Sequence, residues 1–122
     1  MDLLQAFTLF CLFAFGHYLA DFPMQGAYLA QAKNRFRPLE GTPWYQAMTA
    51  HAVLHGGVVG IISGSLWLGL AETLLHALID DRKCAGSFGY NTDQALHLAC
   101  KLLWVALIWS GLIPMGGLFA AF

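Results

Sequence analysis

The sequence contains few charged residues and no excess of basic ones. Lys, Arg, Asp and Glu make up 11% of its 122 residues, whereas about 25% is usual for a soluble domain. The formal net charge of −1 excludes the basic surface that a nucleic-acid-binding protein needs, so no nucleic-acid partner is expected. Hydrophobic residues make up 58% of the chain. This composition favours a multi-pass membrane protein whose main partner is the lipid bilayer.

Cysteine is also scarce. Cys11, Cys84 and Cys100 form no C-x-x-C pair, so neither a zinc–thiolate site nor a disulfide framework is indicated. The first apolar run lacks a basic segment before it and a small-x-small cleavage site before His17. We therefore expect this run to be a retained helix rather than a cleaved signal peptide.

Four apolar segments predict one integral membrane domain over residues 1–122, with spans at about 3–21, 44–62, 66–82 and 93–113, the last ended by Pro114. The expected fold is an all-α, up-down-up-down transmembrane bundle of four helices. Five of the six basic residues lie in the connections 22–43 and 81–92, which places both termini outside the cytoplasm. The expected location is the bacterial inner membrane. The sequence does not decide whether the chain forms a homo-oligomer.

Small residues recur every four positions in the second segment. Ala52, Gly56, Gly60 and Gly64 form a small-x-x-x-small stripe. Such a stripe lets a neighbouring helix approach closely.

All five histidines have a polar partner four residues away. Because four residues are about one helical turn, each pair lies on one helix face. In an up-down bundle these faces meet at the same end. Four histidines then lie in an inner layer, and the fifth histidine and the three aspartates lie in an outer layer. The pairs are His17 with Asp21, His51 with His55, His76 with Asp80, and Asp93 with His97.

Imidazoles and carboxylates without a thiolate are ligands that suit zinc, manganese or iron. We predict that the five histidines bind a divalent metal ion, with zinc preferred, and that Asp21, Asp80 and Asp93 are catalytic. Eight ligands exceed the four of a tetrahedral zinc ion. Either the carboxylates orient the histidines, or two ions share the cluster through a bridging aspartate. A metal-free proton relay and a purely structural network are the alternatives.

Further polar residues surround this predicted cluster. Glu72 and Lys101 lie one turn deeper than His76 and His97, and they are predicted to form a buried ion pair. Four residues at the other side of the cluster are candidates for binding an anionic substrate. These are Gln25, Arg82, Lys83 and Gln94.

The motifs H-x-x-x-D-F-x-x-Q (17–25), H-x-x-x-H (51–55), H-x-x-x-D (76–80) and D-Q-x-x-H (93–97) occur in this order along the chain. Together they resemble a family of small bacterial and phage membrane proteins described only as a domain of unknown function. The resemblance covers nearly the whole chain and implies fold and membrane residence but no activity. The mix of His and Asp is also similar, with different spacing, to that of membrane-bound metal-dependent hydrolases.

Two classes of function follow from the predicted cluster. A metal-dependent hydrolase would use an activated water to cleave a phosphoester, acyl or amide bond in a lipid-like or small anionic substrate. A small cation or proton transporter would instead pass the ion from the cluster onward through Glu72 and Lys101. Beyond that pair the segments offer few polar residues, among them Ser63, Ser65 and Ser110. This favours a one-sided site, and a structural membrane partner protein is the third interpretation.

Overall fold

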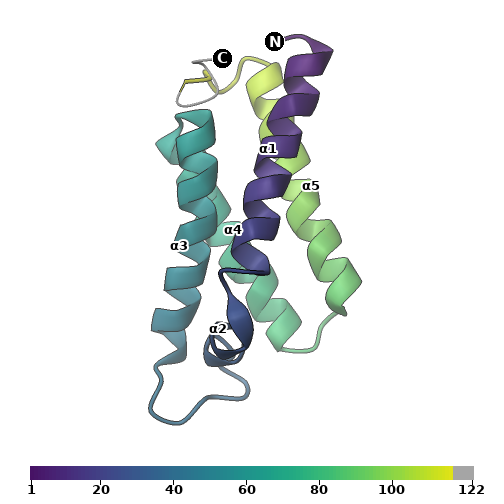
Figure 1. Ribbon diagram of the computed structural model, residues 1–122. Coiled ribbons are helices and arrows are strands. Elements are labelled where there is room, and N and C mark those ends of the chain that lie inside the picture. Colours follow the sequence, from purple (N-terminus) through teal and green to yellow (C-terminus); the bar gives the residue numbers. More distant parts are fainter. Residues whose placement is uncertain (117–122) are drawn as a thin grey trace.

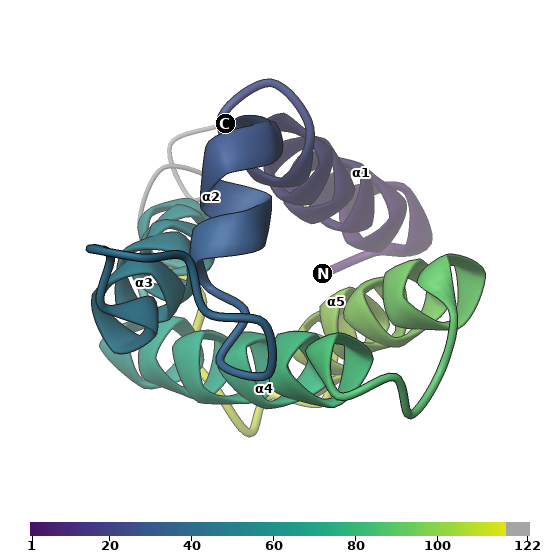
Figure 2. The ribbon, with the colours of Figure 1, turned by 90° about the horizontal axis from the view of Figure 1, so that it is seen from below.

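The computed structural model describes residues 1–116, which form five α-helices. The four long helices run alternately down and up, so that the N-terminus and the segment after the last helix lie at the same end (Figure 1). Seen from below, these four helices form a ring, and the short second helix lies across its lower opening (Figure 2). The helices are α1 (Leu3–Asp21), α2 (Gly26–Ala32), α3 (Trp44–Ser63), α4 (Leu66–Cys84) and α5 (Tyr90–Trp109).

The sequence explains where the long helices end. Gly64 has a φ of 68° and ends α3, because the left-handed conformation is readily adopted by glycine. The side chain of Ser65 then caps α4 by accepting a hydrogen bond from the N–H of Leu68. At the end of α5, Gly111 has a φ of 77°. The helix therefore ends before Pro114, which the sequence analysis took as the stop.

The prediction of a four-span transmembrane bundle is wrong. Among the described residues, α1 is the one helix whose length and composition make it a candidate membrane span. The other long helices are of similar length, but they carry more polar residues along their length than α1, whose pair His17 and Asp21 lies at its end. In α4, for example, these include Glu72, His76 and Asp80. Without four spans, the charge argument that placed both termini outside the cytoplasm no longer applies.

Helix α2 lies in a segment that the sequence analysis treated as a connection. Its seven residues are too few to show a helical hydrophobic pattern. Gly26, with a φ of 62°, lets the chain turn after α1. Helix α2 then packs against α3 and covers the lower end of the bundle (Figure 2).

The upper half of the bundle has an apolar core. It is built around Leu9, Phe13, Val59, Leu68 and Trp104, all of which are buried. Large apolar side chains are also exposed along all four long helices. Exposed apolar surface of this extent marks contact surfaces in proteins generally.

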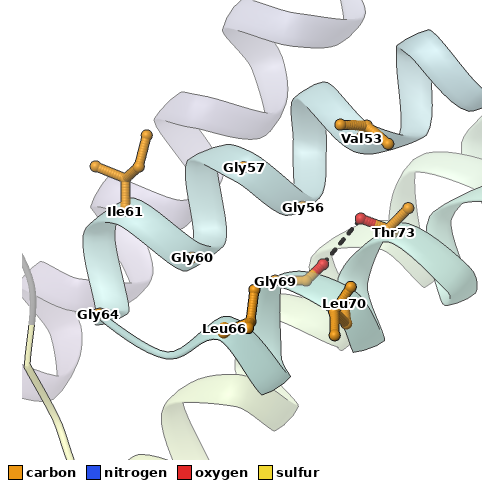
Figure 3. Close-up of a pocket in the computed structure, with 10 residues that line it drawn as sticks. All are labelled: Val53, Gly56, Gly57, Gly60, Ile61, Gly64, Leu66, Gly69, Leu70 and Thr73. Carbon is orange, nitrogen blue, oxygen red and sulfur yellow. Dashed lines mark hydrogen bonds between the residues drawn. The ribbon is translucent and has the colours of Figure 1, made fainter.

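Glycines bring α3 and α4 into close contact, as the stripe in the sequence predicts. A Cβ atom on Gly56 would lie 1.9 Å from Thr73 Oγ1 and 2.4 Å from the Gly69 carbonyl oxygen. The Thr73 hydroxyl donates a hydrogen bond of 2.9 Å to that same carbonyl. On the outside of this contact lies an apolar groove of about 580 Å³, which several glycines line (Figure 3).

We predict that Gly56→Ala lowers the free energy of unfolding by about 2 kcal/mol, because the added methyl group overlaps backbone and forces α3 away from α4. The matched control is Gly57→Ala, where an added Cβ meets no atom within 4 Å. This control should be neutral or stabilising by up to about 1 kcal/mol, since alanine favours a helix more than glycine does. Chemical denaturation measures both changes. Equal stability of the two variants would contradict the close contact.

Candidate metal centre

The four polar pairs of the sequence meet in the lower half of the bundle. Each long helix contributes one pair from one of its faces. All five histidines are at most 1% exposed, so the ring nitrogens face one another rather than solvent. The eight residues are His17 and Asp21 from α1, His51 and His55 from α3, His76 and Asp80 from α4, and Asp93 and His97 from α5.

The carboxylate of Asp21 lies at the centre of one part of this cluster. Its Oδ1 atom is 3.2 Å from His51 Nε2 and 3.1 Å from His55 Nε2. The same oxygen is 3.9 Å from His76 Nε2, while Oδ2 is 3.5 Å from His17 Nε2. Asp21 therefore faces histidines from three helices with both of its oxygens.

Asp80 occupies a similar position on the other side. Its Oδ2 atom lies 3.4 Å from His51 Nε2 and 3.5 Å from His76 Nε2. Its Oδ1 atom lies 3.4 Å from His97 Nε2, which is also 3.5 Å from Asp93 Oδ1. All five histidines thus direct Nε2 toward a carboxylate in the interior of the cluster.

The spacing of these atoms suits a metal ion. In a tetrahedral zinc site with bonds of 2.0–2.1 Å, neighbouring ligand atoms are about 3.3 Å apart. Three groups of side chains in the described residues could hold an ion, each with its ligand atoms within 4.8 Å of one another. They are Asp21 with His51, His55 and His76; His17 with His76 and His97; and Asp21 with Asp93 and His97.

Buried polar atoms without hydrogen-bond partners are a second indication of a metal site. His55 Nε2 and Asp21 Oδ1 are 3.1 Å apart, yet neither has a hydrogen-bond partner of suitable geometry among the described residues. The same holds for His97 Nε2 and Asp93 Oδ1. Buried polar atoms normally have partners. A cation bound to each pair would satisfy its nitrogen and its oxygen.

The carboxylates favour the ionised state that binds metal. Burial raises the pKa of Asp80, but the neighbouring His76, His97 and Lys33 outweigh it and hold this pKa well below its usual range. Burial likewise raises the pKa of Asp93, and His97 again outweighs it, so that the net shift is downward. Both groups are therefore negatively charged at neutral pH.

Most of the histidines whose pKa is shifted by their surroundings favour the neutral state. Burial lowers the pKa of His55 to about 3 and also lowers the pKa of His51. His97 differs, because Asp80 and Asp93 outweigh the effect of burial and raise its pKa. Neutral imidazoles and ionised carboxylates are the forms in which these side chains bind a metal ion.

A cavity of about 350 Å³ adjoins the cluster at the end of the bundle that α2 covers. Its lining includes Asp21 and Asp80 from the cluster, together with three of the four residues predicted to bind a substrate. These three are Gln25, Lys83 and Gln94.

The fourth residue, Arg82, is exposed and does not line the cavity. Helical geometry explains the difference, because successive residues are about 100° apart around the axis. Lys83 comes three residues after Asp80 and shares its face, whereas Arg82 points roughly to the opposite side.

Lys33 is a site residue that lies outside the sequence motifs of the cluster. It follows directly after α2 and is 4% exposed. Its ammonium group donates to the carboxylate of Asp80 and to the amide oxygen of Gln25. The local sequence gives no signal for this contact, because the position of Lys33 depends on how α2 packs beneath the bundle.

Two further contacts support the cluster. The side-chain amide of Gln94 donates a hydrogen bond of 2.9 Å to Asp21 Oδ2. On the opposite side, Glu72 and Lys101 form the buried ion pair that the sequence predicts, and Trp104 Nε1 donates to Glu72 Oε2 at 2.6 Å. Glu72 Oε1 is also 3.7 Å from His76 Nδ1.

Comparisons with protein-family models, with curated proteins and with solved structures find no match to this chain. The family resemblance and the similarity to hydrolases described above therefore stay predictions.

We predict that a divalent metal ion raises the midpoint of thermal unfolding of the wild-type protein, because the ion binds the folded cluster. Asp21→Asn removes a charged member of two of the ligand groups and should weaken metal binding by more than about 100-fold. Asp81→Asn is the matched control, because Asp81 pairs with Arg35 outside the cluster. Calorimetric titration of the metal-free proteins measures the affinities. Equal metal binding by both variants would contradict the assignment.

We also predict a pH effect on metal-free protein that depends on His55. The folded-state pKa of His55, about 3, lies below the ordinary histidine value of 6.5, so the unfolded chain takes up the proton first. The stability from neutral His55 is complete above pH 6.5 and is lost as the pH falls toward 3. Between pH 7.5 and pH 5, wild type should lose about 2 kcal/mol more than His55→Gln. Urea unfolding at both pH values tests this, and parallel losses would refute it.

Proposed function

We propose that this protein is a zinc-dependent hydrolase. The observation that carries the proposal is the convergence of five histidine Nε2 atoms and three ionised carboxylates beside a cavity. Nitrogen and oxygen ligands without sulfur suit zinc, with manganese or iron as alternatives. Zinc in such a site supplies an activated water and polarises the bond to be cleaved.

One ligand group fits a single zinc ion best. Asp21, His51, His55 and His76 provide four ligand atoms, which would fill a tetrahedral site and leave no position for a water. Asp93 and His97 form a second ligand group with Asp21, and its three ligand atoms would leave the fourth position of a tetrahedral ion to the attacking water. Asp21 has both oxygens directed at histidines, as a bridging carboxylate requires.

Asp80 has a different role in this proposal. It belongs to none of the three ligand groups, yet it lines the cavity and lies within 3.5 Å of three histidines. A carboxylate placed between the ligands and the cavity is suited to accept the proton of the attacking water. Lys33, which donates to Asp80, would hold this carboxylate in position.

The upper half of the bundle argues against a transporter built from one chain. Beyond the Glu72–Lys101 pair, the buried side chains of residues 1–116 are apolar, such as Phe13 and Leu68, except for Ser63, whose hydroxyl donates to the Val59 carbonyl. Such a core offers no polar path for an ion or a proton. Access from the α2 end alone favours a one-sided catalytic site.

We predict that the zinc-loaded protein hydrolyses a compound from a panel of chromogenic phosphoesters, carboxylic esters and amides. Asp80→Asn should lower its turnover about 10²- to 10⁴-fold, because it removes the proton acceptor, while the zinc content per chain is retained. The neighbouring Asp81→Asn is the control and should leave both properties unchanged. Colorimetric kinetics and elemental analysis measure these quantities.

The outcomes separate this function from the alternatives. Less than about one tenth of a zinc ion per chain after loading would exclude a metal centre and favour a proton relay. Bound zinc with no hydrolysis of any compound, or equal turnover in the two variants, would exclude the catalytic role of Asp80.

A further inference from the structure

We infer that the cavity beneath the cluster binds a phosphoryl group through Lys83 and Lys33, so that the substrate is a phosphate ester. The inference rests on the proposed hydrolase function and names its substrate class. It starts from two neighbouring cavities at the α2 end, of about 350 Å³ and about 310 Å³. Both are lined by Gln25, Lys33 and Lys83, so the two lysines stand between the cluster and the outside.

Lys83 is the cation available to a ligand. Its side chain is about one third exposed, and its Nζ atom lies 3.5 Å from Asp93 Oδ2, which is an ion-pair distance without a hydrogen bond. The ammonium group also lies 5.3 Å from the centre of the Tyr90 ring, a second lining residue. Lys83 can therefore donate to an incoming oxyanion.

Lys33 is the buried counterpart. Its ammonium group donates to Asp80 and to Gln25, and these two bonds leave one of its three N–H donors free. Because Lys33 and Asp80 line the same cavity, an oxyanion held by this third donor would lie next to the proposed proton acceptor.

The charge around the cavity favours an anion only after metal binding. Without metal, the carboxylates of Asp21, Asp80 and Asp93 outnumber the ammonium groups of Lys33 and Lys83 by one. A divalent ion in the cluster reverses the net charge to positive. Phosphate should therefore bind to metal-loaded protein much more tightly than to metal-free protein.

A phosphate monoester matches these groups better than a carboxylate does. It carries a charge of about −1.5 to −2 at neutral pH, whereas a carboxylate carries one negative charge, so the net positive charge of the metal-loaded site attracts the phosphate more strongly. Lysine is a common ligand of phosphate, which it binds as a point charge. In the cavity next to the cluster, the basic lining residues are both lysines.

A soluble phosphate ester and a lipid phosphate headgroup share this chemistry. The small volume of the cavity limits the group that enters it, but not what is attached outside. The two sources are separate arms of the test.

We predict that zinc-loaded wild type binds inorganic phosphate in calorimetric titration and that Lys83→Gln weakens this binding at least about 10-fold. Arg35→Gln is the matched control, because Arg35 is a basic residue whose guanidinium pairs with Asp81 rather than facing the cavity; its phosphate affinity should be unchanged. Competition with p-nitrophenyl phosphate and with phosphatidic acid in phosphatidylcholine vesicles then distinguishes the two sources. Competition by either compound supports the inference.

The same titrations separate two kinds of failure. Protein that binds no zinc overturns the proposed function and, with it, this inference. Zinc-loaded protein that binds no phosphate, or that binds it equally well in Lys83→Gln, overturns the phosphoryl site alone. Circular dichroism of each variant before titration confirms that the helices are intact.

Discussion

The burial of three carboxylates and five imidazoles at one point is the constraint on which the rest of this structure depends. A buried charge without partners costs several kcal/mol, so each of these groups has to face another across a helix boundary. Asp21 of α1 faces His51 and His55 of α3. Asp80 of α4 faces His97 of α5 and receives a hydrogen bond from Lys33, next to α2. The polar cluster therefore holds all five helices in register.

The two halves of the bundle have different tasks. The upper half packs apolar side chains, while the lower half keeps polar groups close together and open to a cavity. Between them, the ion pair of Glu72 and Lys101 marks the boundary. The glycine contact between α3 and α4 affects both halves of the bundle. It brings the two helices close enough for His51 Nε2 and His76 Nε2 to lie 3.1 Å apart. Packing in one half thereby sets the geometry of the other.

The prediction of four membrane spans shows where composition alone misleads. A low content of charged residues suggests lipid-facing helices, but in this chain the histidines and carboxylates are concentrated within the long helices and lower their hydropathy. One helix, α1, remains a candidate span among the described residues. Composition counts polar residues without stating whether they face a partner, solvent or lipid, so it cannot separate these cases.

The sequence by itself determined which residues share a helix face. The spacing of four residues placed each His/Asp or His/His pair on one side of its helix, and alternating helix directions brought the four pairs to one end of the bundle. The same periodicity predicted the ion pair of Glu72 with Lys101. Only the tertiary structure decided the rotation and register between helices, which spacing within one helix does not fix. That packing placed Lys33 against Asp80 and left Asp80 rather than Asp21 outside the ligand groups.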